Sequence, residues 1–168
     1  MNRPGDPDFE QRRLAARARL DAIDDAGKSD PYRRAWFEAV YESAGSDAAQ
    51  IPWADLSPHP LLAAWLAGAP APAPGARALD IGCGLGDNAA AISAKGWRTT
   101  AFDLSPRAIR WAQSRFPQVG FLAADLFRPP ASNAMSSRRE RIRCSVIIRD
   151  DLTCFAATPC PPAPLAGS

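Results

Sequence analysis

A glycine-rich turn between two hydrophobic runs is the feature that most constrains the fold of this chain. The stretch ALDIGCGLGDNAAA occupies residues 78–91 and places Gly82, Gly84 and Gly86 at alternate positions. An apolar run with one acid, Asp80, precedes the glycines, and an alanine-rich run that favours a helix follows them. Because glycine carries no side chain, such a turn lets a ligand approach the backbone closely. The start of the following helix adds unpaired N–H groups and a partial positive charge.

The residues after this turn continue in an alternating pattern. Short apolar runs predict strands, and the longer runs between them predict helices, the second of which has Ser105 as its cap and Pro106 at its first position. Strand, helix, strand, helix and strand with short connections indicate a parallel α/β sheet wound in the right-handed sense. The expected strands cover 78–81, 97–102 and 119–123, and the expected helices cover 86–95 and 105–116.

The N-terminal part reads differently, as a helical segment over residues 1–67. Helices are expected over 8–26 and 30–45, and a short one around Leu61–Leu66. Alternating proline then favours an extended linker over 68–76.

The spacing of the glycines and the nearby acids indicate the charge of the ligand. Dinucleotide-binding turns follow G-x-G-x-x-G and hold a pyrophosphate. Here the spacing is G-x-G-x-G, and Asp87 stands at the start of the helix, where it would repel a pyrophosphate. Asp80, just before the glycines, likewise suits a cationic group better than an anionic one.

Two further acids end the next two strands. Asp103 follows the second strand, where a carboxylate can accept hydrogen bonds from both hydroxyls of a ribose. Asp125 follows the third strand and could accept from an exocyclic adenine amine. Since the carboxyl ends of parallel strands face one crevice, we expect the three acids to share a ligand site.

Three motifs in this order and spacing resemble the first three motifs of class I S-adenosylmethionine-dependent methyltransferases. They are ALDIGCGLGDNA, TAFDLSPRAIRWAQ and VGFLAADLF. The preceding IPWADLSPHPLLAAWL is similar to bacterial proteins related to thiopurine methyltransferases. The resemblance covers about residues 30–127 and implies a Rossmann-like α/β sheet, here partial, with roughly three parallel strands after the helical segment. It also implies that residues 77–127 form the half of the domain that binds S-adenosylmethionine.

The resemblance assigns the glycine turn to the methionine part of that cofactor. Gly86 would permit close packing of the helix, and Asp87 would add a polar contact. Trp53 would close over the cofactor, with packing in the core as the alternative. The residues that would line the methionine part are Asp80, Gly82, Cys83 and Gly84.

The resemblance assigns the next two strand ends to the adenosine part. Asp103 would hold the ribose, and Leu104 would lie against the adenine. Asp125 would meet the adenine amine, flanked by Ala124 and Leu126.

The sequence assigns no catalytic residue and no metal site. Cys83 is interpreted as a small residue that fits the turn rather than as a nucleophile. His59 lies between two prolines and is interpreted as a loop residue, neither a ligand nor a base. The remaining cysteines fit neither a zinc spacing nor a disulfide framework.

The pattern breaks near Phe127. Residues 1–127 carry 14 Lys and Arg against 15 Asp and Glu, whereas residues 128–168 carry 6 Arg, 3 acids and three of the four cysteines. The segment CSVII could form a strand, but the expected acidic and aromatic residues beside it are missing. We therefore interpret 128–168 as an aberrant, disordered tail and the chain as truncated or frameshifted after about residue 127. A search of the other two reading frames for a hydrophobic strand would test a frameshift.

The function expected from the resemblance is methyl transfer to a small-molecule acceptor, with this chain as an inactive, truncated form of low stability. The alternatives are an NAD(P)-dependent oxidoreductase and a non-catalytic remnant that binds the cofactor. Scattered arginines without aromatic neighbours argue against nucleic-acid binding. No apolar run approaches the roughly 20 residues that span a bilayer, and no signal peptide stands at the N-terminus, so we expect a cytoplasmic protein without membrane contact. Nothing in the sequence indicates an oligomeric state.

Overall fold

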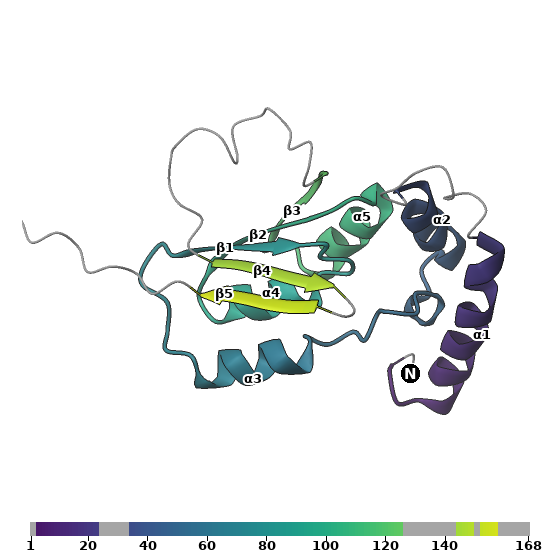
Figure 1. Ribbon diagram of the computed structural model, residues 1–168, viewed down its shortest axis with the longest axis horizontal. Coiled ribbons are helices and arrows are strands. Elements are labelled where there is room, and N and C mark those ends of the chain that lie inside the picture. The colour runs from purple at the N-terminus through teal and green to yellow at the C-terminus, as the bar shows by residue number, and fades with distance from the viewer. Residues whose placement is uncertain (1–2, 24–33, 126–143, 150–151, 158–168) are drawn as a thin grey trace, which may run out of the picture.

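The computed structural model describes residues 3–23, 34–125, 144–149 and 152–157. One five-stranded sheet has the order β3-β2-β1-β4-β5, as Figure 1 shows. Strands β1 (Arg77–Ile81), β2 (Arg98–Asp103) and β3 (Gly120–Ala123) run parallel, and this confirms the expected α/β, Rossmann-like arrangement. The register pairs Asp80 with Ala101 and Phe102 with Leu122.

Two helices connect these strands. Helix α4 (Asp87–Ala94) packs against β1 and β2, and α5 (Pro106–Arg115) packs against β2 and β3. Because both crossovers step in the same direction along the sheet, right-handed connections place both helices on one face. Ser105 caps α5 by accepting from the Ala108 N–H, with proline at the first helical position as predicted.

Two strands occupy part of the segment for which we expected disorder. Strand β4 (Cys144–Arg149) pairs parallel with β1, and β5 (Leu152–Ala157) pairs antiparallel with β4. Strand β4 contains the CSVII run. The sheet therefore differs from the expectation of about three strands and a tail without structure. Residues 126–143, 150–151 and 158–168 lie outside the described part, so the prediction of disorder stays untested there.

The N-terminal helices pack against one another, and one of them joins the others to α5. Helix α1 (Pro7–Ile23) and the short 3-10 helix η2 (Ala48–Gln50) contact each other, and α2 (Arg34–Ala44) contacts α5. Figure 1 shows these elements beyond one end of the sheet, with α3 (Pro60–Gly68) beneath α4. The expected helix starts at residues 30–33 lie outside the described residues.

The hydrophobic core joins the N-terminal segment to the sheet domain. One buried cluster combines Phe9, Trp36 and Val40 with Leu85 from the glycine turn and Ala108 from α5. A second cluster lies between α5 and the strands. The helical segment thus shares a core with the glycine turn, while the domain boundary expected at 68–76 stays a prediction.

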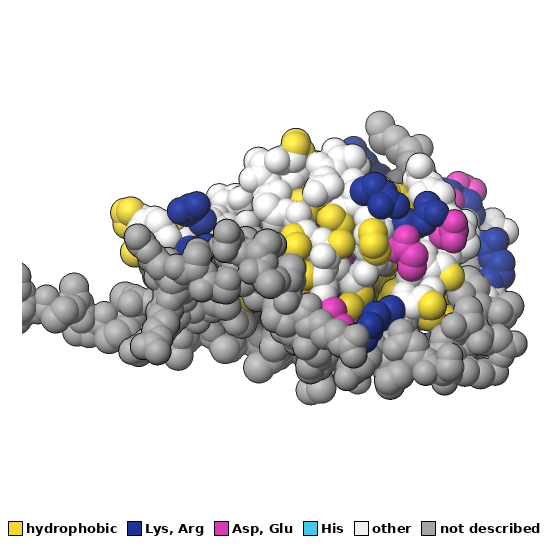
Figure 2. All heavy atoms as spheres, turned by 90° about the horizontal axis from the view of Figure 1, so that it is seen from above, with side chains coloured by type: hydrophobic (Ala, Val, Ile, Leu, Met, Phe, Trp, Pro, Cys, Tyr) yellow, Lys and Arg dark blue, Asp and Glu magenta, His cyan; other side chains and the backbone are white. Residues whose placement is uncertain are grey.

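The surface of the described residues carries both signs of charge. Figure 2 shows basic and acidic side chains side by side on the face that it presents. No helix among the described residues is long and apolar enough to cross a membrane.

Candidate functional site: the glycine turn and the strand ends

The glycine turn adopts a backbone that side chains rarely allow. Gly82, Gly84 and Gly86 have φ values of +72°, +50° and +87°. A Cβ on Gly86 would lie 2.7 Å from the Phe121 ring and 3.2 Å from Ala112. Gly86 therefore lets the start of α4 pack closely against β3 and α5, in keeping with the packing role that the sequence predicted.

The other two glycines differ in what surrounds them. A Cβ on Gly84 would lie 3.1 Å from the Tyr41 hydroxyl of α2, so this glycine makes room for the N-terminal segment. A Cβ on Gly82 would meet nothing within 4 Å. The backbone at Gly82 is therefore bare toward open space, as close approach of a ligand requires.

Asp80 is a buried carboxylate beneath this turn. It lies on β1, the strand flanked by β2 and β4, and its residue is 1% exposed. Neither carboxylate oxygen has a hydrogen-bond partner at normal geometry among the described residues. Burial and the charge of Asp103 raise the pKa of Asp80 to about 7, against the opposing effect of the Ala89 N–H. A buried carboxylate without a partner is costly, so this position favours a ligand group with a positive charge or a hydrogen-bond donor.

Asp103 connects the end of β2 to the glycine turn. Its Oδ2 accepts from the Gly84 N–H and its Oδ1 from the Ser105 N–H, both at 2.9 Å. Burial raises the pKa of Asp103, and these backbone donors oppose the shift. Each carboxylate oxygen can accept a second hydrogen bond. Asp103 can therefore hold the turn and still accept from a ligand.

Asp125 stands beyond the end of β3, next to the N-terminal segment. Its Oδ2 lies 3.3 Å from Nη2 of Arg34, the first residue of α2. Asp125 therefore has a basic neighbour from the N-terminal segment. The adjacent Ala124 donates its N–H to the carbonyl of Asp103, so the ends of β2 and β3 lie side by side. Ala124 and Leu104 are partly exposed, and Leu126 lies outside the described residues.

Asp87 makes an ion pair that the sequence did not indicate. Its two carboxylate oxygens accept from Nη1 and Nη2 of Arg115, each at 2.7 Å. The same Nη1 donates to the carbonyl of Leu85 in the turn. Because Arg115 compensates the charge of Asp87, Asp87 would repel a pyrophosphate much less than the sequence suggested. The structure engages Asp87 in this pair, and its contact with a cofactor stays a prediction.

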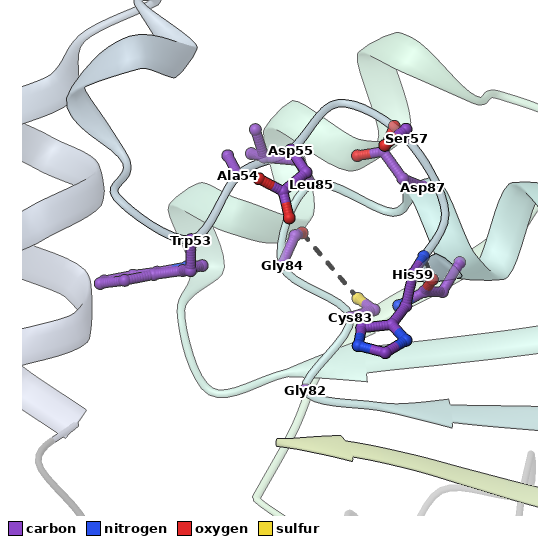
Figure 3. Close-up of a pocket in the computed structure, with 11 residues that line it drawn as sticks. Trp53, Ala54, Asp55, Ser57, His59, Gly82, Cys83, Gly84, Leu85 and Asp87 are labelled. Atoms are coloured by element: carbon purple, nitrogen blue, oxygen red, sulfur yellow. Dashed lines mark hydrogen bonds between the residues drawn. The ribbon is translucent and has the colours of Figure 1, made fainter. Parts of the chain in front are cut away.

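Trp53 packs with aromatic residues of α2. Its indole N–H donates to the Tyr41 hydroxyl at 3.1 Å, and its ring centroid lies 5.7 Å from Trp36 and 5.8 Å from Phe37. Figure 3 shows the indole directed away from Gly82 and toward the N-terminal helices. Trp53 also lines the pocket beside Gly82 and Gly84, so it packs with α2 while its closure over a cofactor stays a prediction.

Cys83 is buried in the core cluster between α5 and the strands. Burial, with the charges of Asp80 and Asp103, raises the pKa of its thiol far above the ordinary range. A thiol that stays protonated is a poor nucleophile. This agrees with the interpretation of Cys83 as a small residue that fits the turn.

A small pocket opens beside the turn, with a volume of about 130 Å³. Asp80 and Asp103 are not among its lining residues. The loop before α3 and the first turn of α4 supply polar side chains that the sequence analysis did not assign to a site: Asp55, Ser57, His59 and Asn88. Figure 3 draws the imidazole of His59 next to the Gly82–Cys83 backbone. These residues carry no motif of their own, and only the fold brings them to the glycines. Among the described residues, no group of His, Cys, Asp and Glu could hold a metal ion.

Comparison with protein families gives a match to part of the chain. Residues 78–142 match the family described as a methyltransferase domain. The match begins in β1 and includes the glycine turn, Asp103 and Asp125. It supports a class I methyltransferase domain in this part of the chain. No curated protein matches the chain.

Several solved structures are similar to parts of the chain. One, from work on the conversion of a disulfide bond into a thioacetal group during echinomycin biosynthesis, is 32% identical over 53% of this chain and 38% of its own, with a TM-score of 0.44. A TehB-like SAM-dependent methyltransferase from Corynebacterium glutamicum is 25% identical over 62% and 51%, with a TM-score of 0.38. A Thermoplasma acidophilum protein is 26% identical over 55% and 46%, with a TM-score of 0.33. The chain thus spans about two fifths to one half of these structures. Its fold is assigned from the strand order and the parallel pairing of its own sheet.

Proposed function

We propose that the chain binds S-adenosylmethionine at the glycine turn and that the domain transfers the methyl group to a small-molecule acceptor. The observation that carries the proposal is the position of Asp80. This carboxylate is buried, has no hydrogen bond of normal geometry among the described residues and lies beneath a turn that is bare at Gly82. The match of residues 78–142 to a methyltransferase domain supports the same conclusion.

The residues at the strand ends fit the parts of this cofactor. Asp103 has acceptor capacity left for the ribose hydroxyls, and Asp125, Leu104, Ala124 and Leu126 would surround the adenine. The backbone from Gly82 to Gly84 would lie along the methionine part. The negative charges of Asp80 and Asp103 would attract a positively charged ligand, because opposite charges in a desolvated site interact strongly.

The cofactor supplies a methyl group on a positively charged sulfur, which is already a good leaving group. The protein then mainly has to align the acceptor and exclude water, an effect of orientation. The turn can contribute because Arg115 and Asp103 both fix its backbone, at the Leu85 carbonyl and the Gly84 N–H. We assign no general base among the described residues.

A small acceptor agrees with the size of the pocket next to the turn. A volume of about 130 Å³ leaves room for a small group beside Gly82. The subgroup related to thiopurine methyltransferases remains part of this proposal, as does the acceptor class.

An NAD(P)-dependent oxidoreductase is less well supported. The ion pair with Arg115 compensates Asp87, but Asp80 and Asp103 still place two carboxylates where a pyrophosphate would need positive charge or N–H donors. The experiment that separates the two is a calorimetric titration with S-adenosylhomocysteine and, separately, with NADH. Binding of the former with no heat from the latter supports the proposal, and the reverse result overturns it.

Transfer itself is tested by following tritium from the methyl-labelled cofactor into a panel of small thiols, phenols and amines. A labelled product with any of them supports a small-molecule acceptor. Binding of S-adenosylhomocysteine without a labelled product would instead support the non-catalytic remnant.

A further inference from the structure

His59 is held at the pocket by one hydrogen bond to its ring and one from its backbone. Its Nδ1 accepts from the Leu61 N–H at 3.3 Å and so caps the start of α3. Its backbone N–H donates to Oδ1 of Asn88, on α4, at 2.8 Å. The ring thus lies in a loop that is attached to both α3 and α4, beside the Gly82–Cys83 backbone (Figure 3).

The bond from Leu61 fixes where the ring carries its proton. A nitrogen that accepts a hydrogen bond has a free lone pair, so a neutral imidazole bonded in this way carries its proton on Nε2. Nε2 is then a donor and cannot remove a proton from a substrate. The sequence-based interpretation of His59 as neither a ligand nor a base stays untested, and a donor at the edge of a pocket is a candidate ligand contact.

Two neighbours add further donors to the same pocket. Because Oδ1 of Asn88 accepts from the His59 backbone, its Nδ2 group is left to donate elsewhere. Ser57 contributes a hydroxyl to the lining. These donors derive from uncharged groups, and no Lys or Arg is among the lining residues.

The two acids of the pocket are compensated from outside it. Asp87 is paired with Arg115, and Asp55 lies 2.9 Å from Nη1 of Arg13. Since Asp80 and Asp103 are not among the lining residues, these two ion pairs lower the electrostatic cost of placing a singly charged anionic group in the pocket itself. A doubly charged phosphate would lack the cation that usually accompanies it.

We infer that His59, with Asn88 and Ser57, binds a carboxylate of the small molecule that occupies this pocket. The inference rests on the proposed function, which offers two sources of a carboxylate: the methionine end of the cofactor or an acidic acceptor. In both cases Nε2–H of His59 donates to a carboxylate oxygen, and the ligand is positioned against the bare backbone of Gly82. His59 then sets specificity and has no part in proton transfer.

Two substitutions separate this role from the capping of α3. In His59→Asn the side-chain oxygen can replace Nδ1 as the cap, since asparagine is a favoured N-cap residue, but the distant donor is lost. In His59→Gln the amide can reach the position of Nε2, but the near acceptor is lost. Ligand binding should therefore fall in His59→Asn and not in His59→Gln, whereas the melting temperature should fall in His59→Gln and not in His59→Asn.

Calorimetry then compares S-adenosylhomocysteine with its decarboxylated analogue. If the carboxylate belongs to the cofactor, His59→Asn weakens binding of S-adenosylhomocysteine by about 10- to 100-fold and leaves the analogue unchanged. If it belongs to the acceptor, S-adenosylhomocysteine binds both proteins alike, and benzoate binds the saturated wild-type protein better than His59→Asn, with no such difference for benzamide.

Equal affinity of wild-type protein and His59→Asn for S-adenosylhomocysteine and for benzoate would overturn the inference and leave the proposed function intact. Failure of the wild-type protein to bind both S-adenosylhomocysteine and its analogue would overturn the proposed function and this inference with it.

Discussion

Arg115 at the end of α5 donates two parallel hydrogen bonds of 2.7 Å to the carboxylate of Asp87 at the start of α4. A third bond of 2.7 Å reaches the Leu85 carbonyl. One side chain thus fixes the last residues of the glycine turn and the first turn of the helix after it. Such bidentate pairs are stronger and more specific in geometry than single contacts.

Removing this pair should destabilise the protein. Arg115→Met leaves the partly buried Asp87 without its partner, and we expect a loss of about 1.5–3 kcal/mol in the free energy of unfolding. In a double-mutant cycle with Asp87→Asn, measured by urea unfolding, the two changes should be coupled by about 0.5–3 kcal/mol. The matched control is Glu42→Gln, which removes an exposed pair with Arg107 and should cost about 0–1 kcal/mol. Additive effects of the two changes would show that the pair does not act as a unit.

Gly86→Ala should be more damaging than an alanine at a glycine with free space. Its Cβ would stand 2.7 Å from Phe121, and φ is +87°, so overpacking of about 1–3 kcal/mol adds to backbone strain of about 1–2 kcal/mol. Gly75→Ala is the control, since φ is +76° there but nothing lies within 4 Å. Urea unfolding of both variants separates strain from packing. Equal losses would mean that the close approach to Phe121 has no energetic weight.

Asp80 should make stability fall as the pH rises. Its pKa is about 7 in the folded protein against 3.8 as the ordinary value, so the folded state holds the proton more tightly. The contribution is fully favourable below about pH 4 and is lost progressively as the pH rises to about 7. Asp80→Asn stays neutral at every pH. Its free energy of unfolding, relative to that of the wild-type protein, should therefore be higher at pH 8 than at pH 5. The same difference at both values would contradict burial as the cause.

Ser105 should stabilise both α5 and its contact with α2. Its hydroxyl accepts from the Ala108 N–H at 3.0 Å and donates to the carboxylate of Glu38 at 2.5 Å. Ser105→Ala should cost about 0.5–2 kcal/mol through loss of the cap alone. Ser114→Ala is the control, because that exposed hydroxyl bonds only within its own helix, to the carbonyl of Trp111. Thermal unfolding followed by circular dichroism gives the melting temperature of both variants. Equal melting temperatures would show that the Ser105 cap does not stabilise the protein.

Local pattern was enough to predict the α/β core and the position of its acids. Short apolar runs alternate with helical runs, and Ser105 and Pro106 start α5. These signals depend only on residues that are close in the sequence. Asp80, Asp103 and Asp125 lie within two residues of strand ends, and parallel strands bring such ends together. The need for glycine at position 86 also follows from the turn.

The side-chain partners could not be predicted, because they come from distant parts of the chain. Arg115 is 28 positions from Asp87, and Glu38 is 67 from Ser105. No periodicity links such residues; the position of α5 beside the start of α4 brings the first pair together, and the packing of α2 against α5 brings the second. The same applies to His59, whose place beside Gly82 depends on where the loop before α3 meets α4. The aromatic neighbours of Trp53 on α2 could not be predicted either, and its assignment to the cofactor from family resemblance stays a prediction.

The central claim is a cofactor site made by the glycine turn and Asp103, and the most direct measurement is calorimetric titration of S-adenosylhomocysteine into the wild-type chain, Asp103→Asn and Asp8→Asn. Asp8 is an exposed acid at the start of α1 and serves as the control. The account predicts one ligand per chain for the wild-type protein and Asp8→Asn, and binding weaker by about 10- to 100-fold for Asp103→Asn through lost ribose hydrogen bonds. No binding by the wild-type chain, or equal binding by Asp103→Asn, would contradict it.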